Sequence, residues 1–343
     1  MKQLLNTLYV TTPNSYLSLD GGNIVLNIDR QKVAKLPLIN FQNIVTFGYA
    51  GVSPALIHYC LGHQIGLSFV SEFGQFLGRI TGETNGNVVL RHRQFVVSTD
   101  PVQSIQIARA CLIGKIYNQR WVLQRAKRDH ALVIDMERIS EVSDTLKDAY
   151  RQFASAKDLD SLRGIEGKLA EQYFSVFDEL ILQQRKDFVF TGRNRRPPID
   201  RVNALLSFTY TLLASDYASA IEAAGLDSYV GFLHQDRSGR NSLALDLMEE
   251  LRSVFADRFV LMLINKRIIG KKDFDVQEDG AVYLNKSGKQ KFIKAWQERK
   301  SETLQHPFLN EKIKWGLVPY AQAMLLARYL RGDLDAYPPF MWK

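Results

Sequence analysis

The sequence predicts an α+β protein with a small N-terminal domain that resembles a β-sandwich, followed by a larger, nearly all-helical domain. Short strand-like runs separated by turn residues fill residues 1–95, whereas apolar residues from Val102 onward recur at helical spacing. The chain of 343 residues is also long for one domain and sufficient for two. We therefore expect a β domain at residues 1–95, a linker at 96–101 and a helical domain at 102–343.

The first part of the chain alternates strand-like runs with turn residues. The expected strands lie at residues 8–10, 16–19, 24–28, 32–38, 65–70, 76–81 and 88–90. Asp20-Gly21 and Gly22-Asn23 are typical of hairpin turns, because these residues tolerate positive φ. One short helix is expected near residues 53–62. Two small sheets packed on each other are the simplest arrangement of such strands.

The helical pattern begins after Asp100-Pro101, since aspartate is a favoured N-cap and proline is favoured in the first turn of a helix. Asp279-Gly280 is the expected turn of a hairpin within residues 270–285, and residues 188–198 are expected to form a loop. Further helices are expected at residues 142–156, 158–185, 199–224, 242–266, 288–304 and 310–331.

The composition is ordinary for a globular protein except for its excess of positive charge. Apolar residues make up 46% of the chain, and the formal net charge is +8. This charge favours an anionic partner, most often nucleic acid. Cys60 and Cys111 lie too far apart to form a metal-binding pair, so we expect buried thiols in a reducing compartment. No secretory signal and no long apolar run is evident, so we expect a cytoplasmic protein with no membrane association.

A polar loop and the helix that follows it, at residues 231–252, are the strongest candidate for a functional site. The loop contains His234, and the helix places Asp246 and Glu249 three residues apart, on one face. An imidazole beside carboxylates suits a hard divalent cation. A single histidine is more often structural, however, and the pair Glu249-Glu250 more often lies on a solvated helix face. The pattern by itself leaves both interpretations open.

A second unusual segment contains Glu166 between Gly164 and Gly167, in a stretch that otherwise favours a helix. The small neighbours would let another backbone or a ligand approach Glu166 closely. The alternative is a helix start at which the glycines allow tight packing. Together, Glu166, His234 and Glu249 could form an open Mg²⁺ or Mn²⁺ site in the helical domain, which could polarise a phosphate.

Arginines flank these two segments and suit a substrate with many phosphates, since each guanidinium can pair with a phosphate. We expect contributions to DNA binding from Arg193, Arg195, Arg196, Arg237 and Arg240. The alternative is a scattered basic surface. The sequence contains no GxxxxGK[ST], HExxH, GxSxG or paired CxxC motif, so ATP hydrolysis, zinc proteolysis and serine-hydrolase chemistry have no support.

Several segments resemble the CRISPR-associated Cas-one integrase family of the spacer-acquisition machinery, and its I-C subtype in particular. The segments that carry the resemblance are RGIEGKLAEQYF (163–174), RRPPIDRVNALLSFTYTLL (195–213) and GFLHQDRSGRNSLALDLMEELR (231–252). The ending AMLLARYLRGDLDAYPPFMWK (323–343) supports the subtype, and KIYNQR (115–120) also fits.

This resemblance implies an N-terminal β domain and a helical catalytic domain. It also implies that the protein forms a homodimer and that two such homodimers clamp a Cas-two dimer. It also implies that the metal ligands and catalytic residues are Glu166, His234 and Glu249, with Asp246 as a supporting acid. The third ligand is an aspartate in some members of the family. The choice between Glu249 and Asp246 therefore stays open.

The implied reaction is a transesterification that serves antiviral defence. The 3′-hydroxyl of a captured double-stranded DNA fragment attacks a phosphodiester at the border of a CRISPR repeat, with a divalent cation and without ATP. Endonuclease cutting follows when water replaces the hydroxyl. Two other functions stay possible from the residues alone: a metal-dependent, structure-specific nuclease of DNA repair, and a non-catalytic DNA-binding scaffold in which the acidic residues are structural.

Overall fold

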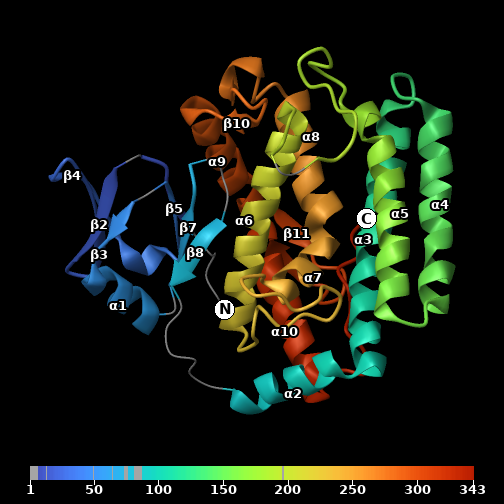
Figure 1. Cartoon of the computed structure of the whole chain (residues 1–343), viewed down its shortest axis with the longest axis horizontal. Coiled ribbons are helices and arrows are strands. Elements are labelled where there is room, and N and C mark those ends of the chain that lie inside the picture. The colour runs from blue at the N-terminus through green and yellow to red at the C-terminus, as the bar shows by residue number, and fades with distance from the viewer. Residues whose placement is uncertain are drawn as a thin grey trace.

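The fold is seen in a computed structural model, which describes residues 7–12, 14–48, 50–63, 65–72, 76–80, 87–194 and 197–343. A small domain of strands lies beside a larger helical body, and helix α2 (Val88–Thr99) runs along the lower edge of that body (Figure 1). The architecture is thus the mixed α+β arrangement that the sequence predicts.

Two four-stranded sheets form the N-terminal domain. The first has the order β4-β3-β2-β6, with antiparallel pairing of β2, β3 and β4. Its strands are β2 (Ser15–Asp20), β3 (Asn23–Ile28), β4 (Gln31–Pro37) and β6 (Gly51–Val52). Gly21 and Gly22 make the β2–β3 turn with φ of 55° and 74°, which explains why glycine occupies both positions.

The second sheet has the order β1-β5-β7-β8, in which β1, β5 and β7 run parallel and β8 is antiparallel. Its strands are β1 (Thr7–Val10), β5 (Asn43–Phe47), β7 (Gly66–Val70) and β8 (Phe76–Ile80). Helix α1 (Pro54–Gly62) precedes β7, and the Ser53 hydroxyl caps it by accepting from the Leu56 N–H at 3.2 Å. The predicted short helix is therefore confirmed.

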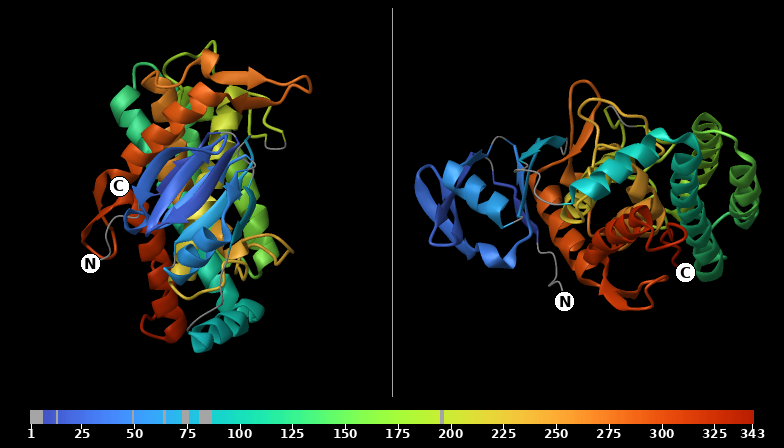
Figure 2. Two further views of the ribbon diagram at one scale, coloured as in Figure 1. Left: turned by 90° about the vertical axis from the view of Figure 1, so that its left-hand side faces the viewer. Right: turned by 90° about the horizontal axis from the view of Figure 1, so that it is seen from below.

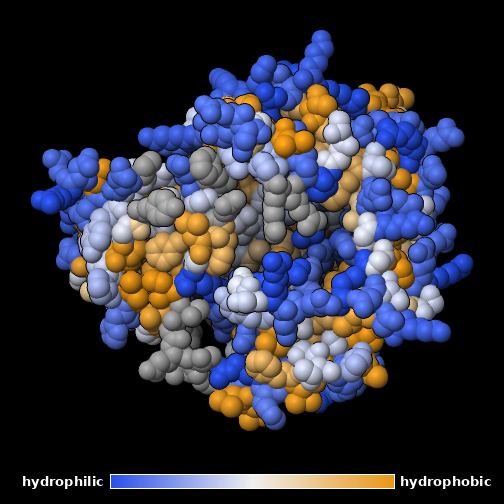
Figure 3. Space-filling model, viewed as in Figure 1, coloured by the Kyte–Doolittle hydropathy of each residue, from blue (hydrophilic) through white to orange (hydrophobic). Residues whose placement is uncertain are grey.

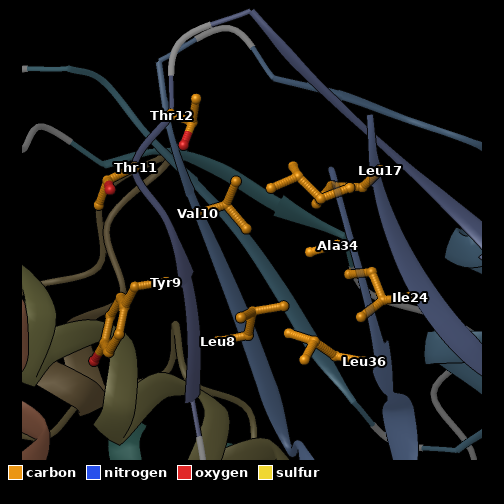
Figure 4. Close-up of a pocket in the computed structure, with 10 residues that line it drawn as sticks. Leu8, Tyr9, Val10, Thr11, Thr12, Leu17, Ile24, Ala34 and Leu36 are labelled. Carbon is orange, nitrogen blue, oxygen red and sulfur yellow. The ribbon is translucent and has the colours of Figure 1, made fainter. Parts of the chain in front are cut away.

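The two sheets share one buried cluster, which includes Leu17, Ile24, Ile44 and Leu67. Figure 2 shows these strands in front of the helical body. A cavity of about 110 Å³ remains between strands β1 to β4 (Figure 4). Its lining is mostly aliphatic, so it is a packing gap in the small domain and not a place for polar chemistry.

Helix α2 (Val88–Thr99) corrects the prediction that residues 88–90 are extended. Leu90, Gln94 and Val97 recur at helical spacing and are buried against the rest of the protein, where the Gln94 amide donates to the Asp227 and Val230 carbonyls. A short run of apolar residues fits a strand or a helix equally well, and these long-range contacts select the helix.

The expected linker at residues 96–101 is also mostly helical. Helix α2 continues to Thr99, and α3 (Pro101–His130) begins two residues later. Asp100 is the N-cap of α3 and accepts from the Val102 N–H at 2.8 Å. The N-cap that the sequence predicts is therefore present, but Asp100 is the single residue between α2 and α3.

The remaining helices form the larger body. They are α4 (Met136–Ser155), α5 (Leu159–Ser175), α6 (Arg201–Ala223), α7 (Ser242–Leu251), α8 (Arg258–Asn265), α9 (Lys286–Ser301) and α10 (Val318–Arg331). Helices α3, α4 and α5 stand side by side at the right of Figure 1, and α6 crosses the centre. Cys60 and Cys111 are both buried free thiols, as expected. None of the described helices is both long and apolar enough to span a membrane.

Two short hairpins interrupt this helical body. The expected hairpin pairs β9 (Phe274–Val276) with β10 (Val282–Leu284), and Gly280 lies in its turn at φ 81°. A second hairpin, β11 (Thr303–Gln305) with β12 (Lys312–Lys314), occupies residues that we expected at the end of one helix and the start of the next. Likewise α5 ends at Ser175, well before residue 185, and a 3-10 turn follows at Phe177–Leu180.

The helical body and the second sheet share one core. The ring of Phe47 on β5 stacks on Phe208 of α6 with 5.7 Å between the ring centroids. Most of the face shown in Figure 3 is hydrophilic over the helices, with an apolar patch at the lower edge where α2 lies. Exposed side chains of α2 include Val88, Val89 and Phe95.

Candidate active site

Helix α7 is buried at every position except Leu245, which is half-buried, and its three carboxylates are buried with it. Asp246, Glu249 and Glu250 are each at most 3% exposed, because α3, α6 and α10 pack around α7. The interpretation that Glu249 and Glu250 lie on a solvated face is therefore wrong. Burying a carboxylate is costly unless it is paired, so each of the three must have its own partners.

Asp246 holds the loop that contains His234. Its carboxylate accepts from the backbone N–H groups of Phe232 at 2.6 Å and of Leu233 and His234 at 3.0 Å each. The Nδ1 atom of His234 lies 2.6 Å from the same carboxylate. When His234 donates from Nδ1, its Nε2 keeps the lone pair that a metal ion or a proton can take. The acceptor positions of Asp246 are thus largely used in positioning His234.

The loop also depends on Gly231 and on contacts with the neighbouring helices. A Cβ atom at Gly231 would lie 2.8 Å from the Cβ of Ser242, closer than side chains pack, so no larger residue fits there. The Ser242 hydroxyl donates to the Gln235 carbonyl at 3.2 Å. From α5, the Nε of Arg163 donates to the Leu233 carbonyl at 3.2 Å. These contacts fix the loop between α7 and α5.

Lys115 of α3 joins two of the three predicted ligands. Its ammonium group lies 2.8 Å from Oε2 of Glu249 and also forms an ion pair with Oε1 of Glu166 on α5. The lysine side chain is 3% exposed. The structure therefore brings Glu166 and Glu249 onto one cationic group, although helix α6 lies between them in the sequence.

The charges around Glu249 keep it ionised. Burial alone would raise its pKa, but the cations Arg252 and Lys115 and the nearby His234 lower the pKa to about 2. Nη1 of Arg252 forms an ion pair with Oε1 of Glu249 at 3.1 Å. A carboxylate that stays charged inside the protein suits the binding of a cation.

The two glycines beside Glu166 leave open space. They lie within α5, and a Cβ atom added at Gly164 or Gly167 would meet nothing within 4 Å among the described residues outside the helix's own backbone. The alternative of tight helix packing at these glycines is therefore wrong. The space instead leaves the α5 surface beside Glu166 accessible to a large ligand.

A second polar network lies behind Arg252. The guanidinium carbons of Arg252 and Arg193 lie 4.9 Å and 5.4 Å from the centroid of the Tyr210 ring. The Tyr210 hydroxyl in turn donates to the buried carboxyl group of Asp257. A π-helical segment, Arg252–Asp257, continues α7, and Arg252 lies three residues after Glu249 on the same side of the helix.

The predicted DNA-binding arginines have different surroundings. Arg193 is half-buried and tied to α6, since it donates to Asn203 at 2.6 Å and to Ser207 at 3.1 Å. Arg237 is exposed and Arg240 is half-buried. Arg195 and Arg196 lie outside the described residues. Whether any of these arginines touches DNA stays a prediction.

The residues fit a divalent cation in the kind of donors they offer, although their present geometry is not that of a loaded site. In the described part of the chain, no three acidic, histidine or cysteine side chains are close enough together to hold a metal ion. Oε2 of Glu249 is buried and lies 2.8 Å from the ammonium group of Lys115. Its contact with Lys115 is an ion pair, so a cation already occupies the position between the two carboxylates.

Sequence reasoning overlooked Lys115, Tyr210 and Asp257. For Lys115 a signal was available, because it lies on the buried face of α3 between Cys111 and Asn118, where a lysine needs an anionic partner. Tyr210 and Asp257 look like ordinary residues of amphipathic helices. Only the packing of α6 against the segment after α7 shows that they share a network.

Comparison with known proteins identifies the family of the chain. The family model of CRISPR associated protein Cas1 matches residues 8–298. The chain is 47% identical over 343 residues, and over the full length of both chains, to CRISPR-associated endonuclease Cas1 1 of Chlorobaculum tepidum.

Two solved structures share the fold. The first is a casposase bound to its integration product, with a TM-score of 0.85 and 22% identity over 99% of this chain and 95% of that one. The second is a Cas6-RT-Cas1–Cas2 complex, in which a chain matches with a TM-score of 0.85 and 22% identity over 100% of this chain and 36% of its own length. On the family match and the identity to its relative, the chain belongs to the CRISPR-associated protein Cas1 family.

Proposed function

We propose that this protein is a metal-dependent DNA endonuclease and integrase that inserts captured DNA fragments into a CRISPR array. The observation that carries the proposal is the placement of Glu166 and Glu249 on a single buried cation, beside a His234 that Asp246 orients. The name of the relative, a CRISPR-associated endonuclease, supports the cutting activity. The casposase bound to an integration product supports DNA joining on the same fold.

In this proposal Glu166, His234 and Glu249 would hold Mg²⁺ or Mn²⁺. Such an ion supplies Lewis-acid stabilisation of the charge that develops on a scissile phosphate. The protein's own part is to orient the ligands: Asp246 fixes the His234 ring, and Arg252 fixes Glu249. Because one phosphodiester is exchanged for another, the reaction needs no ATP.

The third ligand is then Glu249, and Asp246 is the supporting acid. Asp246 accepts three backbone N–H groups and the His234 ring, so it has little capacity left for an ion. Glu249 is held instead by two side-chain cations, Lys115 at 2.8 Å and Arg252 at 3.1 Å. This difference favours Glu249 on chemical grounds.

We also propose that the protein acts as a homodimer with a Cas2 dimer in the cytoplasm, and that it belongs to the I-C subtype. The Cas6-RT-Cas1–Cas2 complex on the same fold supports the Cas2 partner. The substrates are then a double-stranded DNA fragment and the border of the repeat.

A strand-transfer assay tests the function. The purified protein, Cas2 and Mg²⁺ or Mn²⁺ are incubated with a labelled short duplex and a plasmid that carries a repeat. We expect the wild type to join the duplex to the plasmid and Glu166→Gln, His234→Ala and Glu249→Gln to lose joining while they remain folded. The matched control is Glu302→Gln, which removes an exposed glutamate from a surface ion pair and should keep joining.

Joining that survives in Glu166→Gln would contradict the proposed site. Cutting of DNA by the wild type without any joining would instead indicate the repair nuclease. A wild-type protein that binds DNA but neither cuts nor joins it would indicate the non-catalytic scaffold. Thermal unfolding of each variant shows whether a loss of activity reflects a loss of folding.

A further inference from the structure

Lys115 is an unusual residue for the interior of a helical body. Its side chain is 3% exposed, and its ammonium group contacts both Glu166 and Glu249. Lysine is rarely buried unless it is paired, and here the pair is formed by two residues that the proposed function assigns to a metal ion. The buried cation and the proposed ion therefore need the same oxygens.

The position of Lys115 is fixed by its helix. Residue 114, next to it, is a glycine whose added Cβ would lie 3.0 Å from Pro339 and 3.2 Å from Glu250, so α3 and α7 approach closely there. One turn further on, Asn118 donates to the Glu250 carbonyl at 2.7 Å. A shift of the helix would break these contacts, whereas the lysine side chain has several rotatable bonds and can move without breaking them.

Two carboxylates beside each other repel unless a cation lies between them. Arg252 compensates Oε1 of Glu249, and Lys115 is the cation that joins Glu249 to Glu166. A divalent ion bound to both carboxylates would take over this compensation. It would then face the positive charge of Lys115 at contact distance, which repels it unless the ammonium group moves away.

We propose that Lys115 is a built-in counter-cation, which holds the acidic pair together in the metal-free protein and competes with the divalent ion for it. This inference rests on the proposed function, because it concerns the same site. Lys115 is thus a positioning residue that lowers the metal affinity of the free protein. A displaced ammonium group needs another anion, and a DNA phosphate at the site would provide one. DNA therefore favours loading of the ion.

The test is a titration of the full chain with Mn²⁺, followed by the EPR signal of the free ion. We expect Lys115→Met to bind Mn²⁺ at least about tenfold more tightly than the wild type, since the competing charge is gone. Lys115→Arg keeps the charge and should bind no more tightly than the wild type. A short duplex should strengthen Mn²⁺ binding in the wild type and have a smaller effect in Lys115→Met.

The matched control is Lys300→Met. Lys300 is also buried, and it pairs with Asp216 at 2.8 Å. Its replacement should lower stability without tightening Mn²⁺ binding. Thermal unfolding in EDTA and in Mn²⁺ gives a second measurement: the stabilisation by Mn²⁺ should be larger in Lys115→Met than in the wild type.

Equal or weaker Mn²⁺ binding by folded Lys115→Met would overturn the inference and leave the proposed function standing. The absence of Mn²⁺ binding by the wild type and by every variant, with and without DNA, would overturn the metal-dependent function and the inference with it. Tighter binding in both Lys115→Met and Lys300→Met would also overturn it, because the effect would not depend on the acidic pair.

Discussion

At the scale of single residues, the site separates two acids that look alike in the sequence. Asp246 and Glu249 lie one turn apart on α7, and both are buried. Asp246 accepts backbone N–H groups of the His234 loop, whereas Glu249 meets the cations Lys115 and Arg252. The first is therefore a structural acid that orients His234, and the second is the one suited to an ion.

Asp246→Ala should destabilise the protein strongly. It leaves the N–H groups of Phe232, Leu233 and His234 without their buried acceptor, which costs at least about 3 kcal/mol in the free energy of unfolding. Chemical denaturation measures the loss. The control is Asp236→Ala in the exposed part of the same loop, for which we expect a change within about 0.5 kcal/mol. Similar stabilities for the two variants would contradict this account.

Asp257 should make stability depend on pH. Burial raises its pKa from the ordinary 3.8 to about 6, against the opposing effects of Tyr210, Arg252, Tyr173 and Arg193. Below pH 3.8 the group is protonated in the folded and the unfolded chain alike. As the pH rises further, the unfolded chain ionises first, so the folded state loses stability until the folded pKa is passed.

The variant Asp257→Asn isolates this effect because its side chain stays neutral. Relative to Asp257→Asn, the wild type should lose about 3 kcal/mol of unfolding free energy between about pH 4 and pH 7. The measurement is urea denaturation of both proteins across this range. The difference in unfolding free energy between the wild type and Asp257→Asn could instead stay constant with pH, or the wild type could gain stability relative to the variant. Either result would show that the carboxyl group ionises normally in the folded protein.

At the scale of elements, the C-terminal segment stabilises the back of the site. The Phe340 N–H donates to Glu250 at 2.8 Å, and the Phe340 carbonyl accepts from Asn118 at 2.7 Å. The Asn118 side chain also accepts from the Trp342 N–H at 2.9 Å. The segment thus completes the hydrogen bonds of α3 and α7, the two helices that carry Lys115 and Glu249.

Phe340→Ala should therefore cost more than a substitution at an ordinary terminal residue. Phe340 is fully buried and packs on Trp315 and His306, so we expect a loss of about 4 kcal/mol. The neighbouring Met341 is partly exposed, and Met341→Ala should cost less than about 1.5 kcal/mol. Thermal or urea unfolding of the two variants compares them directly. Equal losses would mean that the segment is not docked as described.

At the scale of the whole molecule, the excess charge of +8 and the helical body point to a polyanionic partner. The β domain is joined firmly to that body: the Thr7 carbonyl on β1 accepts from Gln297 of α9 at 2.5 Å, and Phe47 stacks on Phe208. Of the predicted DNA-binding arginines, Arg237 is the simplest to test, because it is exposed.

Arg237→Ala should weaken DNA binding equally for different sequences. If Arg237 pairs with one phosphate, the slope of log affinity against log salt concentration should become shallower by about 1. Fluorescence anisotropy at several salt concentrations measures both quantities. Lys286→Ala removes the same charge from an exposed position on α9 and should leave the slope unchanged. An unchanged slope for Arg237→Ala would remove this arginine from the interface.

Local patterns along the chain predict the two-part architecture and the segments of the candidate site. Turn residues such as Asp20-Gly21 and the cap at Asp100 act on their immediate neighbours, so their effects can be predicted locally. The periodicity of apolar residues located most of the helices for the same reason. The resemblance of three segments to a known family then supplied Glu166, His234 and Glu249.

The contacts of those residues depend on how distant helices and loops pack together. Residues 88–90 became helical because Gln94 and its neighbours bury against distant loops. Lys115 lies between Glu166 and Glu249 only because α3, α5 and α7 pack together, and Asp246 differs from Glu249 only because the 231–234 loop folds over one and not the other. Such contacts join residues far apart in the chain, and no local pattern encodes which partner a buried charge will find.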